Sequence, residues 1–233
     1  MTTNHVVITG ANRGIGLELA RLAVARGDSV TAGCRRPAQA DALQALATSH
    51  ANLEIRAVTV DDADSLAAFT AALDGRRVDV LINNAAIVGP PAEQQSAFTM
   101  DYDSWAETFA VNSIAPVRVL HALRGNLEKS NLAKAVSVSS QMGAISVDMA
   151  FTLAYCASKA ALNKVMRLMA PEFAELGIVI SLVHPGWVRT DMGGDDADIA
   201  PEESAAGLWS VIDKLTLADA GSFYSWTGER HPW

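Results

Sequence analysis

Short apolar runs alternate with stretches of helical spacing along the whole chain, and this alternation limits the fold more than any other feature. Residues 5–9 read His-Val-Val-Ile-Thr, a buried strand, and residues 13–26 have the apolar spacing of a helix that stops at Gly27. Near-continuous apolar strands separated by helices are typical of a parallel sheet covered on both faces. We therefore predict an α/β fold with a doubly wound, mostly parallel, seven-stranded sheet.

The predicted elements continue this alternation to the end of the chain. Strands are predicted at residues 5–9, 29–34, 54–59, 78–82, 135–139, 178–183 and 222–224. Helices are predicted at residues 13–26, 38–47, 64–73, 101–123, 152–176 and 202–213. Ligands of such sheets bind at the carboxyl ends of the strands, so we expect the site residues in the loops that follow the strands.

The composition bounds the class of protein. The 233 residues are 50% hydrophobic and 19% charged, which fits a single globular domain over residues 1–233 and excludes intrinsic disorder. The 18 basic and 26 acidic side chains give a net charge of −8, which argues against a nucleic-acid partner.

The sequence contains no targeting or metal-binding signal. No apolar run reaches the ~18 residues of a membrane span, and the first residues lack a basic leader followed by an apolar stretch. The 2 cysteines, Cys34 and Cys156, have no C-x-x-C spacing, and the 5 histidines lack the spacing of metal ligands. We expect a cytoplasmic protein without membrane association and without a metal.

A glycine-rich turn joins the first predicted strand to the first helix. Residues 9–16 read Thr-Gly-Ala-Asn-Arg-Gly-Ile-Gly. Glycines permit a tight turn and a close approach of the backbone to a pyrophosphate, which the following helix N-terminus attracts. The spacing differs from the commoner Gly-x-Gly-x-x-Gly of Rossmann folds, and the alternative is a turn that only connects strand and helix. Its strand–turn–helix context favours a dinucleotide site in a Rossmann fold.

The end of the second strand indicates which dinucleotide is bound. NAD sites usually place an acidic residue there to accept the ribose hydroxyls, but this chain has Cys34-Arg35-Arg36. Arg35, together with Arg13 in the glycine turn, has the charge to clamp a 2′-phosphate. We therefore predict NADP(H) as the preferred cofactor and NAD(H) as the second choice. The alternative is that both arginines are simply solvated.

Tyr155 and Lys159 are four residues apart in a predicted helix, on one face of it. A phenol titrates at about 10 in water, and a nearby ammonium favours the phenolate. The pair is suited to general acid–base chemistry on a carbonyl or an alcohol. Because Tyr-x-x-x-Lys also occurs by chance on surface helices, its position one helix after the fifth strand is what favours a function.

Asn112 stands at a predicted interruption of the helix over 101–123. Trp105, Phe109 and Asn112 share one face of that helix. Pro116 has no N–H, so it leaves the Asn112 carbonyl without its helical partner. The sequence predicts a kink with a free inward carbonyl, and the alternative is a polar side chain satisfied at that kink.

Taken in order, these motifs resemble the short-chain dehydrogenase/reductase family. The likeness spans nearly the whole chain and rests on the glycine turn, Asn83-Asn84-Ala85-Ala86, Ser139-Ser140, Tyr155 with Lys159, and His184-Pro185-Gly186-Trp187-Val188-Arg189-Thr190. Within the family, the short length and the ending Gly-Glu-Arg-His-Pro-Trp resemble the bacterial C-factor proteins and the sniffer-type carbonyl reductases.

The resemblance implies a role for each matching catalytic residue. Tyr155 would exchange a proton with the substrate oxygen, and Lys159 would hold the nicotinamide ribose and lower the pKa of Tyr155. Ser140 would hydrogen bond to the substrate oxygen, with Ser139 as the alternative. Asn112 would complete a catalytic tetrad by holding a water that is linked to the lysine.

The motifs and the resemblance together predict the cofactor contacts. These are Gly10, Asn12, Arg13, Gly14, Ile15, Gly16, Arg35, Asp61, Asp62, Asn84, Ala85, Ala86, Tyr155, Lys159, Pro185, Gly186, Val188 and Thr190. Ala86 stands where the family usually has glycine, and its methyl group is expected near the cofactor ribose. For Asp61 and Asp62, which match the adenine-contacting position, a solvated turn is the alternative.

A mostly apolar set of residues is predicted to line the substrate pocket, with ordinary packing as the alternative for each. The set comprises Ile87, Val88, Gln141, Met142, Phe151, Trp187 and Met192. Such a lining fits hydrophobic aldehydes or ketones. The resemblance implies an NADPH-dependent carbonyl reductase. The alternatives are a dinucleotide-binding signalling protein of the C-factor type and an NAD-dependent alcohol dehydrogenase.

Two further expectations concern the surface. The resemblance implies a short substrate lid at about residues 188–203, and much of the acidity lies in it: Asp191, Asp195, Asp196, Asp198, Glu202 and Glu203. Such a charge is expected to repel anionic substrates. The resemblance also implies a homodimer or homotetramer that pairs through the helices at 101–123 and 152–176, where Pro171 is a candidate kink.

Overall fold

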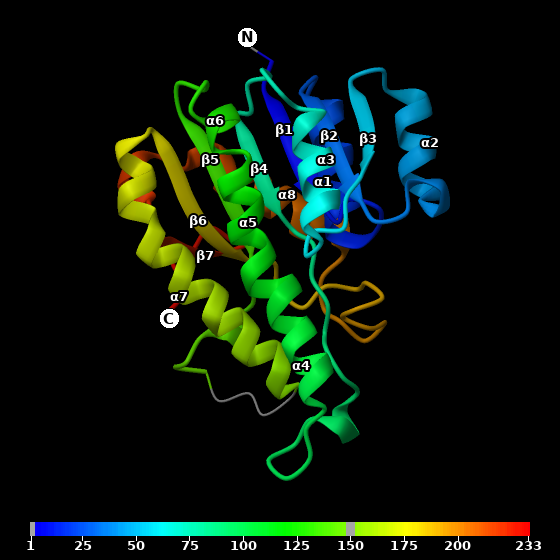
Figure 1. Ribbon diagram of the computed structural model, residues 1–233, viewed down its shortest axis with the longest axis vertical. Coiled ribbons are helices and arrows are strands. Elements are labelled where there is room, and N and C mark those ends of the chain that lie inside the picture. The colour runs from blue at the N-terminus through cyan, green and yellow to red at the C-terminus, as the bar shows by residue number, and fades with distance from the viewer. Residues whose placement is uncertain (1–2, 148–151) are drawn as a thin grey trace.

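The computed structural model describes residues 3–147 and 152–233 and contains one seven-stranded sheet (Figure 1). Its strands are β1 (His5–Thr9), β2 (Ser29–Cys34), β3 (Leu53–Ala57), β4 (Val80–Asn83), β5 (Ala133–Val138), β6 (Ile178–His184) and β7 (Ser222–Ser225). Their order is β3-β2-β1-β4-β5-β6-β7, and every neighbouring pair is parallel. The predicted doubly wound α/β fold is confirmed, and the sheet is parallel throughout.

Different helices cover the two faces of this sheet. The helices are α1 (Gly14–Ala25), α2 (Asp41–Ser49), α3 (Ala63–Ala71), α4 (Tyr102–Phe109), α5 (Ala115–Ala122), α6 (Arg124–Leu127), α7 (Leu153–Glu175) and α8 (Pro201–Lys214). Along β1, Val6 and Ile8 face α1, α2 and α8, whereas Val7 faces the layer of α3, α5 and α7 (Figure 1). The strands are therefore buried on both sides, which explains their near-continuous apolar sequences.

The helix predicted over 101–123 is divided by a π-helical turn, Ala110–Ile114. The Ala115 N–H donates to the Ala110 carbonyl five residues back, and Pro116 has no N–H to offer Asn112. The predicted interruption at Asn112 is confirmed, in the form of one wide turn between α4 and α5.

Other element ends differ from the prediction by a few residues. Pro37–Gln39 forms a short 3₁₀ turn, so α2 begins at Asp41. β4 begins only at Val80, because the Val78 N–H donates to the Asn126 carbonyl at 3.1 Å, outside the sheet. α7 continues through Pro171 to Glu175, so the proline ends no helix.

The strand order creates a switch point beside β1. The strands run outward from β1 to β3, and β4 then returns to the other side of β1. At such a switch point the loops after the two central strands leave in opposite directions and open a crevice at the carboxyl edge of the sheet. The glycine turn follows β1, Asn84 follows β4, Ser140 follows β5 and Pro185 follows β6, so all four reach this edge.

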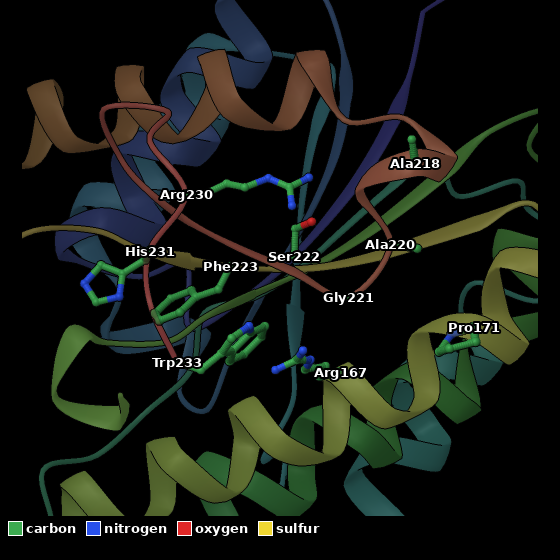
Figure 2. Close-up of a pocket in the computed structure, with 10 residues that line it drawn as sticks. All are labelled: Arg167, Pro171, Ala218, Ala220, Gly221, Ser222, Phe223, Arg230, His231 and Trp233. Carbon is green, nitrogen blue, oxygen red and sulfur yellow. The ribbon is translucent and has the colours of Figure 1, made fainter. Parts of the chain in front are cut away.

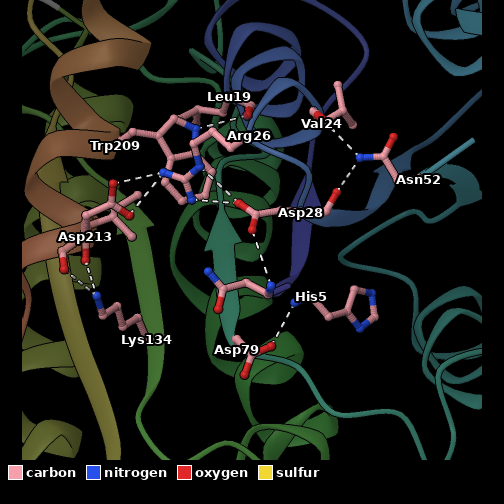
Figure 3. A network of polar contacts seen from close by, with 12 residues as sticks. His5, Leu19, Val24, Arg26, Asp28, Asn52, Asp79, Lys134, Trp209 and Asp213 are labelled. Carbon is pink, nitrogen blue, oxygen red and sulfur yellow. Dashed lines mark hydrogen bonds and ion pairs between the residues drawn. The ribbon is translucent and has the colours of Figure 1, made fainter. Parts of the chain in front are cut away.

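A polar network stabilises the opposite, amino-terminal edge (Figure 3). Arg26, at the end of α1, donates to Asp28 at 2.7 Å and to Asp213 of α8 at 2.9 Å. Its guanidinium also lies 3.9 Å from the centre of the Trp209 ring. Lys134 of β5 donates to the Asp213 carbonyl at 2.8 Å. Arg26 thus joins α1 to α8 and to the start of β2.

We expect Arg26→Ala to lower the free energy of unfolding by about 1–3 kcal/mol, because it leaves the carboxylate of Asp28 largely buried without its cation. Denaturant unfolding followed by circular dichroism measures this change. Arg124→Ala is the control, since the exposed pair of Arg124 and Glu128, four residues apart at the end of α6, supports a change of less than about 0.5 kcal/mol. Equal effects of the two substitutions would contradict the assignment.

Candidate active site

The glycine turn packs against the loop that follows β4. Gly10 has a φ of +67°, and a Cβ at this position would lie 2.8 Å from the Cα of Ala85. A Cβ on Gly16 would lie 2.3 Å from the Gly10 carbonyl oxygen and 2.4 Å from the Asn84 amide nitrogen. A side chain at either position would separate the turn from the loop, so this contact explains why both residues are glycine.

Asn84 and Thr9 hold the two segments together. The Asn84 side-chain amide donates to the carbonyls of Thr9 and Gly10, at 3.2 and 3.0 Å. The Thr9 hydroxyl accepts the backbone N–H groups of Asn84 and Ala85, at 3.1 and 3.2 Å. The Asn84 side chain therefore shapes the glycine turn from behind. Ala85 and Ala86 continue this loop and are partly exposed.

The N-terminus of α1 has the properties of a phosphate site. No side chain among the described residues caps it, and its first turn contains no acidic residue. Its first N–H groups therefore keep their donors for a ligand, at the positive end of the helix dipole. Asn12 and Ile15 of the turn are partly exposed. This helix end, with the close-packed glycines before it, fits the pyrophosphate of a dinucleotide.

Arg13 is engaged within the protein. Its guanidinium forms an ion pair with Asp191 in the segment after β6, and both side chains are mostly exposed. Arg13 was expected to face a 2′-phosphate, and Asp191 was expected to belong to an acidic run without basic residues. In the structure, the positive charge of Arg13 is instead paired with the negative charge of Asp191.

The end of β2 is basic and has no acidic partner. Arg35 and Arg36 are exposed, and neither forms an ion pair within the part of the chain that the structure describes. Farther along the same edge, the Asp62 carboxylate accepts the Ser65 N–H at 2.7 Å and caps α3. Asp62 therefore has a structural role, while the carboxyl group of Asp61 is partly exposed.

Ser140, Tyr155 and Lys159 meet between β5 and α7. The Ser140 hydroxyl forms a hydrogen bond with Tyr155. Lys159 is buried, and its Nζ lies 5.6 Å from the centre of the Tyr155 ring and donates to the Val138 carbonyl at 2.8 Å. The arrangement places a serine hydroxyl in a hydrogen bond with the phenol and a lysine amine near its ring.

Ser139 is directed elsewhere. Its hydroxyl donates to the Asn163 side-chain oxygen at 2.5 Å, inside the protein. Neighbouring residues of an extended segment point to opposite sides, so only one serine of the pair reaches Tyr155. That residue is Ser140.

Burial controls the titration of this group. Desolvation raises the pKa of Tyr155 to about 12, against the opposing hydrogen bond with Ser140. Desolvation also lowers the pKa of Lys159 to about 7. The expected net lowering of the Tyr155 pKa is not seen in this structure, because desolvation of the phenol is the largest effect. Tyr155 is therefore protonated at neutral pH.

Asn112 connects the loop after β4 to the catalytic helix. Its side-chain oxygen accepts the Ile87 N–H at 2.9 Å, and its amide donates to the Ile87 carbonyl at 2.8 Å and to the Ser158 hydroxyl at 3.0 Å. Ser158 donates in turn to the Tyr155 carbonyl at 2.8 Å. The Asn112 side chain is thus fully bonded within the protein, and its main-chain carbonyl lies in the π turn.

Sequence reasoning missed Ser158 and Gln95. Ser158 is three residues after Tyr155, so helical spacing was an available signal. Gln95 is buried in the long irregular segment between β4 and α4, and its side-chain oxygen accepts the Ala154 N–H at 2.9 Å at the start of α7. No local sequence pattern indicates that contact, because Gln95 and Ala154 are 59 residues apart.

The segment after β6 forms a closed loop. Gly186 has a φ of +87°, and a Cβ on it would lie 2.1 Å from the Ile199 side chain. Val188 pairs with Ile199, and the Pro185 carbonyl accepts the Ser204 hydroxyl at 2.6 Å. Residues 188–199 are therefore anchored at both ends, beside the glycine turn.

The predicted pocket residues lie at the same edge of the sheet. Ile87, Val88, Gln141 and Met142 are partly buried in the loops after β4 and β5, and Trp187 and Met192 are 48% and 46% exposed after β6. Phe151 lies outside the described residues.

A separate cavity of about 350 Å³ lies between α7 and β7 (Figure 2). Arg167 and Trp233 face each other on its wall, with the guanidinium 4.6 Å from the indole centre, and Arg230 and Ser222 lie opposite. Arg167 is 12 residues along α7 from Tyr155, about 18 Å at helical rise. None of the residues predicted for the site lines this cavity.

Among the described residues, no three histidine, cysteine, aspartate or glutamate side chains come together as a metal site requires. Among the helices described, none combines the length and the apolar character that crossing a membrane needs.

Comparison with known proteins places the chain in a family. Residues 4–199 match the family model of the short chain dehydrogenases. The C-signal protein of Myxococcus xanthus is 39% identical over 157 residues, which cover 67% of this chain and 93% of that protein.

Several solved structures align with 100% of both chains, and two of them are carbonyl reductases from animals. An NADPH-bound carbonyl reductase from chicken fatty liver has a TM-score of 0.92 and 34% identity, and the carbonyl reductase Sniffer of D. melanogaster has a TM-score of 0.91 and 28% identity. The resemblance drawn from the motifs is confirmed. The chain belongs to the short-chain dehydrogenase family of oxidoreductases.

Proposed function

We propose that the protein is an NADPH-dependent reductase that converts the carbonyl group of hydrophobic aldehydes or ketones to an alcohol, reversibly. The observation that carries this proposal is the hydrogen bond between Ser140 and Tyr155, with the Lys159 amine 5.6 Å from the centre of the Tyr155 ring, at the edge of the sheet that also bears the glycine turn. The likeness to NADPH-bound carbonyl reductase over the whole chain supports it.

The residues around the crevice fit NADPH. The uncapped start of α1 and the glycine turn would hold the pyrophosphate, and Arg35 at the end of β2 would bind the 2′-phosphate, where an NAD site needs an acid. Val188, Thr190 and the Pro185-Gly186 turn would contact the nicotinamide end. When bound, NADPH supplies the hydride for the carbonyl carbon.

Tyr155 acts as the proton donor to the carbonyl oxygen. Since its pKa is raised to about 12, the phenol carries its proton at neutral pH, which suits the direction of reduction. Ser140 orients the carbonyl oxygen by a second hydrogen bond. The alkoxide that forms in the reaction takes the phenolic proton, and the buried Lys159 stabilises the phenolate that remains.

Asn112 and Pro116 provide the route for restoring that proton. The Asn112 carbonyl lies in the π turn, where Pro116 offers no N–H, so it would keep an acceptor for the water that the family resemblance links to Lys159. The Asn112 side chain meanwhile fixes the distance between the Ile87 loop and α7.

The partly exposed apolar side chains after β4, β5 and β6 favour a hydrophobic substrate. Trp187 and Met192 offer apolar surface at the mouth of the site. Pairing of two chains through α4–α5 and α7 is proposed on the exposed Ile114 and Leu168, which are 48% and 62% accessible on those elements.

We expect Tyr155→Phe to lower kcat for NADPH-dependent reduction of aldehydes by about 10²–10⁴-fold, because the ring remains and only the proton donor is lost. Stopped-flow or steady-state NADPH oxidation measures kcat, and NADPH titration shows whether binding persists. Tyr102→Phe is the control, since it removes the same hydroxyl group from an exposed tyrosine that is not one of the predicted site residues. Wild-type turnover in Tyr155→Phe would refute the mechanism.

We expect Arg35→Ala to weaken NADPH binding about tenfold or more while leaving NADH binding nearly unchanged, because it removes a charge-assisted contact to the 2′-phosphate alone. Titration of both cofactors against the variant gives the two Kd values. The matched control is Arg56→Ala, an arginine already paired with Glu54. If the ratio of the two affinities does not change, the chain selects its cofactor by other residues, and an NAD-dependent dehydrogenase becomes the better assignment.

The likeness to C-signal supports a second candidate, a protein that signals by binding the dinucleotide without turnover. The two candidates differ in one measurement. Tight NADPH binding with no oxidation across a panel of aldehydes, ketones and diketones would favour the second.

A further inference from the structure

The ion pair between Arg13 and Asp191 spans the two segments that border the proposed cofactor crevice. We infer that Asp191 is a specificity-determining residue, whose carboxylate competes with the 2′-phosphate of NADPH for the guanidinium of Arg13. The inference rests on the proposed function, because it assumes that NADPH binds at the glycine turn. It assigns to one acidic residue an effect on the choice between NADPH and NADH.

The backbone holds Asp191 in place independently of Arg13. The Gly194 N–H donates to the Thr190 carbonyl at 2.8 Å, and the Gly193 N–H donates to the Thr190 hydroxyl at 3.1 Å. The Trp187 indole N–H donates to the Gly193 carbonyl at 2.8 Å. Asp191 lies within this bonded turn, so its carboxylate is presented by the fold itself.

The turn also packs directly on the glycine turn. A Cβ on Gly14 would lie 3.0 Å from the methyl carbon of Thr190. Arg13 precedes Gly14 and Asp191 follows Thr190, so the two charges lie next to the place where the Thr190 side chain approaches Gly14. Under the proposed function, the Arg13 guanidinium therefore has two anionic partners to choose from: the Asp191 carboxylate and the 2′-phosphate of NADPH.

The two anions differ in strength. Asp191 carries one negative charge and meets a single Nη of Arg13, in a pair whose side chains are 66% and 71% exposed. A phosphate monoester carries nearly two charges and three acceptor oxygens, so it outcompetes the carboxylate. NADPH binding would then break the pair, whereas NADH has no group to replace the carboxylate and leaves the pair intact. The pair thus weakens NADPH binding only.

Asp195 provides a control of equal charge. It lines the same surface hollow as Thr190, Asp191 and Gly194, and it forms no ion pair among the described residues. Removing its charge changes the field around the crevice to a similar extent. It does not release Arg13.

The test is titration of the full chain with NADPH and with NADH, for wild type, Asp191→Asn and Asp195→Asn. We expect Asp191→Asn to lower the Kd for NADPH by about twofold to fivefold, the range that an exposed ion pair supports, with the Kd for NADH unchanged. Asp195→Asn is expected to change the ratio of the two Kd values by less than half as much. In an Arg13→Ala background, Asp191→Asn should have no further effect on that ratio.

Three results would overturn the inference: a higher NADPH Kd in Asp191→Asn, equal effects of Asp191→Asn and Asp195→Asn, or a full effect without Arg13. A wrong cofactor assignment gives a different result, because the wild type itself would then bind no NADPH. A protein that binds NADPH without turnover is recognised separately, because it does not oxidise NADPH in the presence of aldehydes or ketones. The titrations therefore separate an error about Asp191 from an error about the cofactor.

Discussion

The contact between the glycine turn and the loop after β4 is the constraint on which the rest of the site depends. Two glycines allow the two backbones to come so close that a methyl group on either glycine would not fit. Asn84 and Thr9 hold the two segments together with four hydrogen bonds. Once β1 and β4 are fixed in this way, the loop that carries Ile87 runs beside Asn112, and Asn112 reaches α7. The position of Tyr155 therefore follows from a packing requirement more than 70 residues away.

The elements and motifs could be predicted because their signals are local. Apolar strands, a glycine turn before a helix and a proline after Asn112 act within a few residues, and the structure contains each of the elements that they indicate. The family follows from the same signals, whereas the order of the strands comes from the structure. The family resemblance favoured Ser140 over Ser139, whereas alternation along a strand alone gives opposite directions without saying which serine faces Tyr155.

The contacts that sequence reasoning missed are long-range. Gln95 supports the start of α7 from an irregular segment, and Arg13 meets Asp191 across 178 positions. The titration of Tyr155 was also misjudged, because a helical spacing of four residues shows that Lys159 is near and says nothing about how deeply both groups are buried. The negative charge of the segment over 191–203 is also partly balanced in the folded protein. Arg13 pairs with Asp191, and Glu202 and Glu203 lie in the first turn of α8, at the positive end of its dipole.

The burial of Lys159 has a consequence for the stability of the whole protein. An unfolded chain holds the lysine proton up to its ordinary pKa of 10.5, whereas the folded protein releases it near 7. Between these values the unfolded state binds more protons, so this residue makes the free energy of unfolding rise as the pH increases, and its full cost is present below pH 7. An apolar side chain of similar length would remove that cost. The folded protein thus has a lower free energy of unfolding in return for a buried amine near Tyr155.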